Sequence, residues 1–280
     1  MKKNSIAIAG ASGFVGKYLQ NTFKDAVILY RNDSVDVLVD KLKDVDTVIN
    51  LAGAPIVKRW NDSYKKLLYR SRVETTKKLV EAINKSNVSY FISTSAIGIY
   101  PNGKTCDESC KDYADDFLAS LCADWEAEAL QCQKPTAIMR FGVVLGKNSG
   151  ALVKMLLPFK LGLGGVIGDG KMMTSWITIS DLLKMYQFLI DNKVEGIFNA
   201  VAPTPVGNAV FTKVLGKVLH RPTFFPLPIF MLKLIYGEAT CVLTDSKEVY
   251  PQKIIELGFE FEHKTVEVAL LNILSDNKTI

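Results

Sequence analysis

Short apolar runs alternate with longer segments of helical periodicity through the first half of the chain. The apolar runs are rich in β-branched residues and end in small or polar residues, which is typical of strands buried in a parallel sheet. Strands that alternate with helices predict a doubly wound α/β sheet, whose ligand crevice lies at the carboxyl ends of its strands. The predicted strands are 5–9, 26–30, 46–53, 88–95 and 136–145, and the predicted helices are 17–23, 62–84 and 115–133.

The second half of the chain has a different pattern, with apolar helical segments and a glycine-rich interruption at 162–170. We therefore expect a Rossmann domain over residues 1–147 and a smaller, mostly helical C-terminal substrate lobe over residues 148–280. Segments 182–190 and 196–200 are expected to return to the main sheet, so that the two parts interleave. The last stretch, from residue 224 onward, is expected to cover the ligand crevice.

A glycine-rich segment joins the first predicted strand to the first predicted helix. Strand, glycine turn and helix together form the context of a dinucleotide-binding motif. Gly10 permits the tight turn, Gly13 lets the backbone approach a pyrophosphate, and Gly16 lets the helix pack closely on the strand. The helix N-terminus then presents its N–H groups to the phosphates. The predicted phosphate loop is Gly10, Ala11, Ser12, Gly13, Phe14, Val15 and Gly16.

Arg31 and Asn32 follow the second predicted strand. In a dinucleotide fold an acidic residue at this place binds the ribose 2′-hydroxyl, whereas an arginine suits a 2′-phosphate. Arg31 therefore predicts NADP(H) as cofactor in preference to NAD(H). A surface arginine without a ligand is the alternative.

Composition narrows the chemistry further. Lys plus Arg number 34 and Asp plus Glu 29, giving a net charge of +5, and the basic residues are scattered along helices, Lys77 and Lys78 among them. This pattern is typical of a solvated face, so we expect no nucleic-acid partner. The chain has two histidines, and no cysteine pair at ligand spacing, so neither a metal centre nor a histidine-based site is expected.

The cysteines and the apolar segments bear on the compartment. The five cysteines are an odd number without a signal peptide before them, which predicts free thiols in a cytoplasmic protein. The longest apolar segment, 224–236, is interrupted by Pro226, Pro228 and Lys233 and is too short to span a membrane. The sequence leaves a monomer and a homodimer equally open.

Two further motifs, Asn50-Leu-Ala-Gly53 and Ser93-Thr-Ser-Ala96, join the glycine loop in a resemblance to a known family. Together the three resemble an extended short-chain dehydrogenase/reductase, and more narrowly the NAD-dependent epimerase-like family of the bacterial YfcH type. The resemblance runs nearly end to end, and its other motifs are at 59–60, 71–75, 116–119, 125–126, 161–170, 175–177, 202–208, 237–238 and 258–261.

This resemblance implies an NADP(H)-binding protein. One departure from the family is that only eighteen residues separate Arg31 from Asn50, so the strand usually found between them is expected to be shortened or lost. Arg72 lies near the apolar stripe of the predicted helix 62–84, from which it reaches either solvent or the cofactor edge of the sheet. The implied cofactor contacts are Arg31, Asn32, Leu51, Ala52, Gly53, Arg72 and Val143.

The catalytic residues of the superfamily are only partly present. Redox members use a serine or threonine together with a tyrosine and a lysine four residues apart on one helix face. Ser95 matches the hydroxyl, but the helix segment around 120–126 contains neither tyrosine nor lysine. Tyr100 is the candidate proton donor, and a pair of Cys122 and Glu126 is a second candidate. The alternative for that pair is a buried small residue and a structural acid.

The substrate half departs from the sugar-nucleotide enzymes of the extended class. There an arginine follows a Gly-Asp-Gly turn and pairs with the substrate diphosphate. Here Gly168-Asp-Gly170 is followed by Thr174 at the matching position. A nucleotide-sugar substrate is therefore not favoured.

Two functions remain. The first is an NADP(H)-dependent oxidoreductase or epimerase-like enzyme that acts on an unidentified small molecule, with Ser95 polarising a carbonyl and Tyr100 or a water as proton donor. The second is a non-catalytic NADP(H)-binding sensor or interaction protein, such as the cell-division role attributed to some relatives. Retention of Ser95 and of a complete substrate lobe favours the first, and the missing tyrosine and lysine favour the second.

Overall fold

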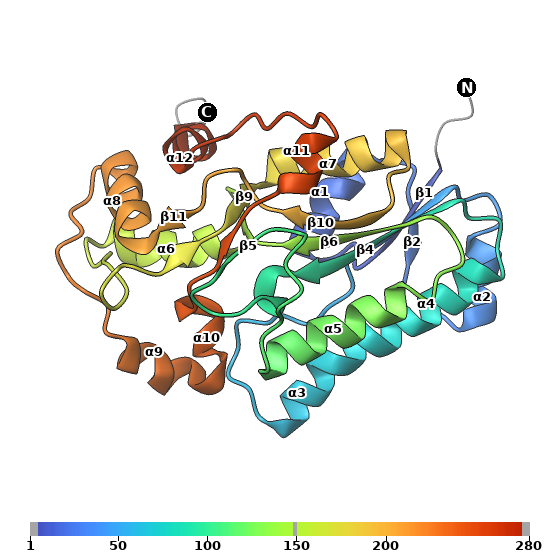
Figure 1. The fold of residues 1–280 in the computed structure, drawn as a ribbon, viewed down its shortest axis with the longest axis horizontal. Coiled ribbons are helices and arrows are strands. Elements are labelled where there is room, and N and C mark those ends of the chain that lie inside the picture. The colour runs from blue at the N-terminus through green and yellow to red at the C-terminus, as the bar shows by residue number, and fades with distance from the viewer. Residues whose placement is uncertain (1–4, 148–149, 276–280) are drawn as a thin grey trace.

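A parallel sheet of six strands forms the centre of the computed structural model, which describes residues 5–147 and 150–275 (Figure 1). Every pair of neighbouring strands in this sheet is parallel. The predicted doubly wound α/β fold is therefore confirmed. In spatial order the strands are β10 (Gly196–Ala200), β6 (Thr136–Phe141), β4 (Tyr90–Ala96), β3 (Thr47–Asn50), β1 (Ile6–Ala9) and β2 (Val27–Leu29).

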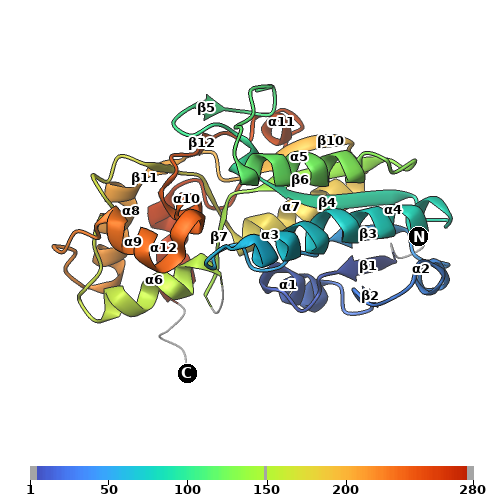
Figure 2. The same ribbon diagram turned by 90° about the horizontal axis from the view of Figure 1, so that it is seen from below.

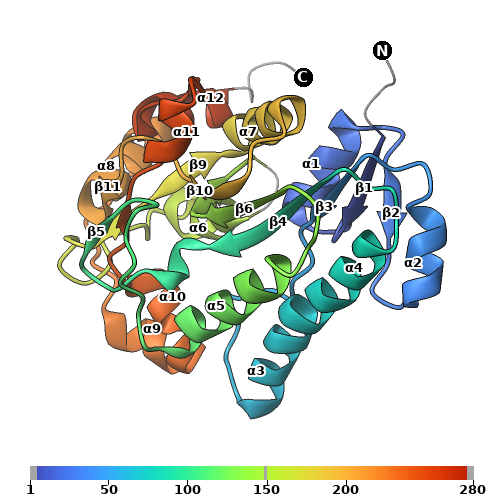
Figure 3. The same cartoon turned by 45° about the vertical axis from the view of Figure 1, so that its right-hand side comes forward.

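Helices cover both faces of the sheet (Figures 1 and 3). Because side chains of a strand alternate between faces, Ile6 and Ile8 pack into one apolar cluster and Ala7 and Ala9 into another. The first face is covered by α1 (Phe14–Thr22) and α7 (Ile179–Asn192), and the second by α2 (Val35–Lys41), α4 (Thr75–Asn84) and α5 (Phe117–Ala129). Helix α3 (Asp62–Tyr69) precedes α4 and packs through Leu68 in a separate cluster.

Strand β2 is the edge of the sheet, and α2 leads from it directly to β3. Among the described residues no strand lies beyond β2. The strand expected to be shortened or lost between Arg31 and Asn50 is therefore absent from the described residues, where α2 alone connects β2 to β3.

The predicted strand 136–145 is wrong in one respect, because it is two strands in two sheets. β6 ends at Phe141, and β7 (Val143–Leu145) pairs with β9 (Trp176–Thr178) outside the main sheet. Between them lies Gly142, where an added Cβ would stand 2.6 Å from the carbonyl oxygen of Ser175. The close approach of the 175 backbone turns the chain out of the sheet here. The chain returns as β10, as expected for 196–200.

The C-terminal lobe is mostly helical and lies beside one end of the sheet (Figure 2). Helices α8 and α12 pack together around an apolar cluster that includes Phe211 and Leu270. The expected boundary at Asn148 falls outside the described residues, as do Met1 to Asn4. Of the helices described, none has the length and apolarity needed to cross a membrane. The lobe contains α6 (Ala151–Lys160), α8 (Asn208–Leu219), α9 (Ile229–Tyr236), α10 (Cys241–Thr244) and α12 (Val266–Ser275), with the short pair β8 (Met173–Thr174)–β11 (Val206–Gly207). From the same half of the chain, α11 (Gln252–Glu256) packs against β10 of the main sheet, and β12 (Glu248–Val249) pairs with β5 (Thr105–Cys106).

The turn after β1 offers a test of how tightly the sheet end is packed. Gly10 has φ +82°, and an added Cβ would lie 2.6 Å from the backbone carbon of Leu51. Gly103 has a similar φ of +74° but nothing within 4 Å of an added Cβ. We expect Gly103→Ala to lower the free energy of unfolding by about 1–2 kcal/mol, the cost of the left-handed conformation alone.

We expect Gly10→Ala to lower it further, because the 51–52 backbone must also move. Urea denaturation of both variants measures the difference. Equal losses in the two variants would contradict close packing at the β1 turn.

Candidate functional site

A cavity of about 220 Å³ lies at the carboxyl ends of β1, β2 and β3. This is where open α/β sheets bind ligands. The cavity brings together many of the residues predicted from the sequence, which come from three separate segments. Those that line it are Gly10, Ala11, Ser12, Gly13, Arg31, Leu51, Ala52 and Gly53.

One wall of the cavity is the turn that leads into α1. The Gly13 N–H donates to the Gly10 carbonyl oxygen at 3.0 Å, and α1 begins at the next residue, Phe14. No side chain caps this helix at Gly13. The first N–H groups of a helix have no partner within it, so this wall is suited to an anion.

The rest of the predicted phosphate loop supports this turn without lining the cavity. Val15 and Gly16 are buried, and a Cβ on Gly16 would stand 2.4 Å from the Gly10 carbonyl oxygen. The Phe14 ring packs beside Gly146 and Gly150.

The opposite end of the cavity is basic. Arg31 lines it, and Asn32 beside it is exposed without lining it. Lys78 of α4 also lines the cavity, and its Nζ donates to the Arg31 carbonyl oxygen and, at 2.7 Å, to that of Asp33. The assignment of Lys78 to a solvated face is therefore wrong, because the helix is held against the end of β2.

The acid nearest to this basic end is already paired. Asp33 accepts from Lys41 Nζ at 2.6 Å and from the Tyr30 N–H at 2.8 Å. Burial works against ionisation, but these hydrogen bonds and the charges of Lys41 and Lys78 outweigh it and lower the pKa of Asp33. The two cations Arg31 and Lys78 thus face the cavity end beside a neutralised acid.

Besides Lys78, several lining residues were not anticipated from the sequence. Thr75, Lys78 and Leu79 share one face of α4, three and four residues apart; this spacing groups them, but it does not indicate which strand ends that face meets. The other unanticipated lining residues are Ala9, Ile28, Leu29, Tyr30 and Leu38.

Arg72 lies beneath the loop that follows β3. The predicted helix 62–84 is present, but a π-helical turn over Arg70–Glu74 separates α3 from α4, and such turns are frequent at functional sites. Arg72 Nη2 donates to the Ala54 carbonyl oxygen at 2.9 Å, and its guanidinium lies 5.4 Å from the Trp125 ring centre. Burial lowers the pKa of Arg72. Arg72 is half-buried and supports the 51–54 loop, so it is not turned fully to solvent, and it does not itself line the cavity.

Ser95 belongs to a buried ionic network at the end of β4. Its Oγ donates to Glu126 Oε1 at 2.6 Å. Arg140 of β6 binds the same carboxylate with two hydrogen bonds, Nε to Oε1 at 2.8 Å and Nη2 to Oε2 at 2.7 Å. Glu126 is therefore a structural acid paired with Arg140, and a thiol–carboxylate pair with Cys122 is not formed. Burial raises the pKa of Cys122 to about 12.

Tyr100 is part of the same network and is fully buried. Its hydroxyl donates to Asn199 Oδ1 at 3.0 Å and accepts from Arg140 Nη1 at 2.8 Å. Burial raises the pKa of Tyr100 to about 12. Neither Tyr100 nor Ser95 lines the cavity, and the sequence of α5 contains no tyrosine and no lysine.

Two other expectations concern the substrate side. Val143 does not line the cavity; its N–H donates to the Ser175 carbonyl oxygen at 2.9 Å. No described residue beyond 224 lines the cavity either. The C-terminal stretch, expected to cover the ligand crevice, therefore does not cover this part of it. The lobe instead meets the segment after β3, where Arg59 Nη1 donates to the Leu234 carbonyl oxygen at 2.7 Å.

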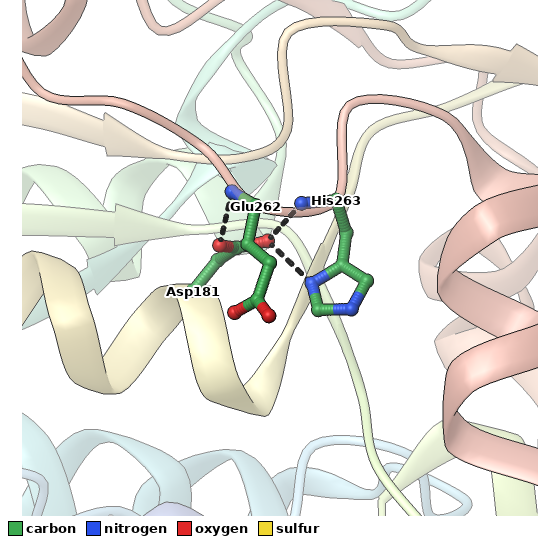
Figure 4. A group of neighbouring side chains, drawn as sticks. All are labelled: Asp181, Glu262 and His263. Atoms are coloured by element: carbon green, nitrogen blue, oxygen red, sulfur yellow. Dashed lines mark hydrogen bonds and ion pairs between the residues drawn. The ribbon is translucent and has the colours of Figure 1, made fainter.

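Asp181, Glu262 and His263 form a group of possible metal ligands (Figure 4). Both carboxylate oxygens of Asp181 accept backbone N–H groups, from Glu262 at 2.8 Å and from His263 at 3.0 Å. The His263 ring also lies 3.1 Å from Asp181 through Nδ1. Since the carboxylate is occupied by these donors, the group fastens the 262–263 segment to the first turn of α7.

Comparison with known proteins agrees with this geometry. Residues 6–200 match the NAD dependent epimerase/dehydratase family, and residues 227–273 match a domain of unknown function (DUF1731). The chloroplastic "Epimerase family protein SDR39U1 homolog" of Arabidopsis thaliana is 35% identical over 96% of this chain and 86% of its own length. An epimerase family protein of Staphylococcus haemolyticus is 33% identical over 95% of this chain and 98% of its own length.

Solved structures extend the likeness. The human epimerase family protein SDR39U1, crystallised with NADPH, superposes with a TM-score of 0.89 at 30% identity, covering 97% of this chain and 99% of that one. A UDP-N-acetylglucosamine 4-epimerase from Bacillus cereus, at 18% identity and a TM-score of 0.77, shares the fold. With a glycine turn, a cavity at the strand ends and a family match over most of its length, the chain belongs to the NAD dependent epimerase/dehydratase family.

Proposed function

We propose that this chain binds NADP(H) in the cavity at the ends of β1, β2 and β3. The observation that carries the proposal is the pairing of an uncapped helix start at Gly13 with two cations, Arg31 and Lys78, at the other end of one cavity. The human relative crystallised with NADPH supports it.

The residues present suit each part of such a dinucleotide. The glycine turn has no side chains to exclude a pyrophosphate, and a Cβ on Gly13 would lie 3.2 Å from the Gly10 carbonyl oxygen. Arg31 and Lys78 supply charge for a 2′-phosphate, which NAD(H) lacks. Leu38 and Leu79 are the apolar lining for an adenine ring. When bound, the cofactor supplies a hydride donor or acceptor.

The first role we propose is an oxidoreductase or epimerase-like enzyme for a small carbonyl or hydroxyl compound, with Ser95 polarising the carbonyl. A serine hydroxyl has one proton to donate, and in the structure that proton goes to Glu126. Ser95 therefore has to exchange Glu126 for the substrate oxygen before it can act. Tyr100 holds its own proton tightly, so a water is the better proton donor.

A second role, NADP(H) binding without catalysis, is favoured by one specific observation. The hydroxyl protons of Ser95 and Tyr100 are both already donated, to Glu126 and to Asn199. A binding or sensor protein needs only the cavity, and this arrangement leaves the cavity intact.

Cofactor preference can be tested by removing each cation of the cavity end. Loss of a charged hydrogen bond to a phosphate costs about 1.5–3 kcal/mol, so we expect Arg31→Ala and Lys78→Ala each to weaken NADPH binding by roughly 10- to 100-fold. NADH binding should change little, because it offers no 2′-phosphate. Fluorescence titration measures both dissociation constants.

Lys77→Ala is the matched control, since Lys77 is exposed on the same helix and does not line the cavity. Equal weakening of NADPH and NADH in the Arg31 and Lys78 variants would refute the 2′-phosphate assignment. Failure of the unaltered protein to bind either dinucleotide would refute the proposed function.

The two roles differ in what Ser95 does. If the chain is an enzyme, a panel of small carbonyl compounds will include one that oxidises bound NADPH, and Ser95→Ala will reduce that rate by roughly 10²- to 10⁴-fold. Ser120→Ala, a surface change on α5, is the control and should leave the rate unchanged. The non-catalytic role is supported if the protein binds NADPH, oxidises none of it across the panel, and binds it equally well after Ser95→Ala.

A further inference from the structure

Two thiols lie unusually close together outside the cofactor cavity. Cys106 at the end of β5 and Cys110 in the following loop have their sulfur atoms 2.8 Å apart. Non-bonded atoms rest at about 3.5–4.0 Å, and a disulfide bond is about 2.05 Å long. The pair therefore stands between ordinary contact and a covalent bond. Cys122 of α5 belongs to the same apolar cluster as Cys106, whereas Cys132 and Cys241 pack against other clusters.

The backbone on both sides holds the two thiols in this position. β5 pairs with β12, so that Cys106 stands opposite Val249 at the margin of the molecule (Figure 2). The Cys110 N–H donates to the Asp107 carbonyl oxygen at 3.2 Å, and the Asp107 side chain accepts from the Ser109 N–H at 2.8 Å. A bond between the sulfurs thus needs little movement of the chain.

The loop itself is fastened to the body of the protein by Glu108. This carboxylate accepts from the Asn199 N–H at 2.8 Å and from the Lys253 N–H at 3.2 Å. The thiol pair is therefore part of a packed segment and not of a freely moving loop tip.

A shallow, open hollow in the surface gives small molecules access to the pair. Both cysteines line it, with Thr105, Asp107, Tyr250 and Gln252. Cys110 is partly exposed, whereas Cys106 is buried.

The geometry does not suit a metal ion. Two thiolates on a tetrahedral zinc, at about 2.3 Å from the metal, stand roughly 3.8 Å apart. Within residues 5–147 and 150–275, the side chains grouped closely enough to hold a metal ion are Asp181, Glu262 and His263, and neither cysteine is among them. Thiol chemistry is the better account of the pair.

We propose that Cys106 and Cys110 form a dithiol–disulfide exchange site that reduces small-molecule disulfides. The Cys110 thiolate attacks one sulfur of the small disulfide, whose other half leaves as a thiolate and takes up a proton. The Cys106 thiol then loses its proton and attacks the Cys110 sulfur, releasing the second half as a thiol. Two cysteine thiols are oxidised to one protein disulfide, and one small disulfide is reduced to two thiols.

The order of attack follows from the surroundings of the two sulfurs. Burial and the neighbouring Cys110 raise the pKa of Cys106 to about 12, so Cys106 is a poor first nucleophile at neutral pH. Once Cys110 is held in a mixed disulfide, its part of that rise is gone. Cys110 is the thiol that the hollow exposes. Cys110 is thus the attacking residue and Cys106 the resolving one.

The test uses oxidised glutathione on the full chain without any dinucleotide, so its result is independent of the proposed function. Intact mass and alkylation mapping follow the products in the unaltered protein and in Cys106→Ser, Cys110→Ser and the control Cys132→Ser. We expect the unaltered protein and Cys132→Ser to lose two hydrogen atoms in mass and to contain a peptide cross-linked between Cys106 and Cys110. Cys106→Ser should retain one glutathione on Cys110, and Cys110→Ser should carry none on Cys106.

Two results would overturn the proposal. One is a mixed disulfide that persists on Cys110 in the unaltered protein, because Cys106 then does not resolve it. The other is an unaltered protein whose Cys106 and Cys110 both remain free thiols in excess oxidised glutathione. Both results come from the unaltered chain, so they stand even if a serine variant fails to fold, and thermal unfolding of each variant checks that point.

Discussion

The ion pair between Arg140 and Glu126 is the interaction on which the interior of this structure depends. It joins β6 to α5, and through Arg140 it also holds Tyr100 and Tyr113 by their hydroxyls. Ser95 of β4 completes the set. A buried pair of this kind adds little net stability over a well-packed apolar replacement, but loss of one partner leaves an unpaired buried charge and costs about 3–5 kcal/mol. The ion pair fixes the positions of five side chains, those of Ser95, Tyr100, Tyr113, Glu126 and Arg140.

This network bears directly on the proposed function. In the superfamily that the chain resembles, a tyrosine and a lysine four residues apart on one helix adjoin the catalytic hydroxyl. Here Cys122 and Glu126 have that spacing on α5, and Glu126 holds both Ser95 and Arg140. The polar groups at the end of β4 are thus arranged to satisfy one another. The cavity at the ends of β1, β2 and β3 is lined by a different set of residues.

The parts of the site that sequence predicted well are those set by local backbone demands. Gly10 and Gly13 stand out because a tight turn with a close backbone neighbour tolerates no side chain, and Arg31 because it directly follows a strand. Lys78 was missed because its role depends on Arg31, 47 residues earlier in the chain, and periodicity along one helix does not report which strand end that helix faces.

Long-range packing also explains the remaining errors. The run 136–145 contains Gly142, a residue that often marks a bend in a strand, but the pattern does not show that the chain leaves the main sheet there. That exit accompanies the close approach of the Ser175 backbone. Tyr100 was placed beside the cofactor from its distance to Ser95 in sequence. Its hydroxyl instead meets Arg140 and Asn199, residues whose approach is decided only when β6 and β10 pair.

The exit at Gly142 and the return at β10 have a consequence for how this chain is made. The last strand of the main sheet is completed only when residue 200 is available, after β7, α6 and β9 have been synthesised. Until then β6 is an edge strand with one side unpaired, and such edges invite association with other chains. Domains generally fold as units as they emerge during synthesis. In this protein the main sheet is completed only after part of the second half of the chain has been made, so β6 is open to misassembly while residues 142 to 196 are being synthesised.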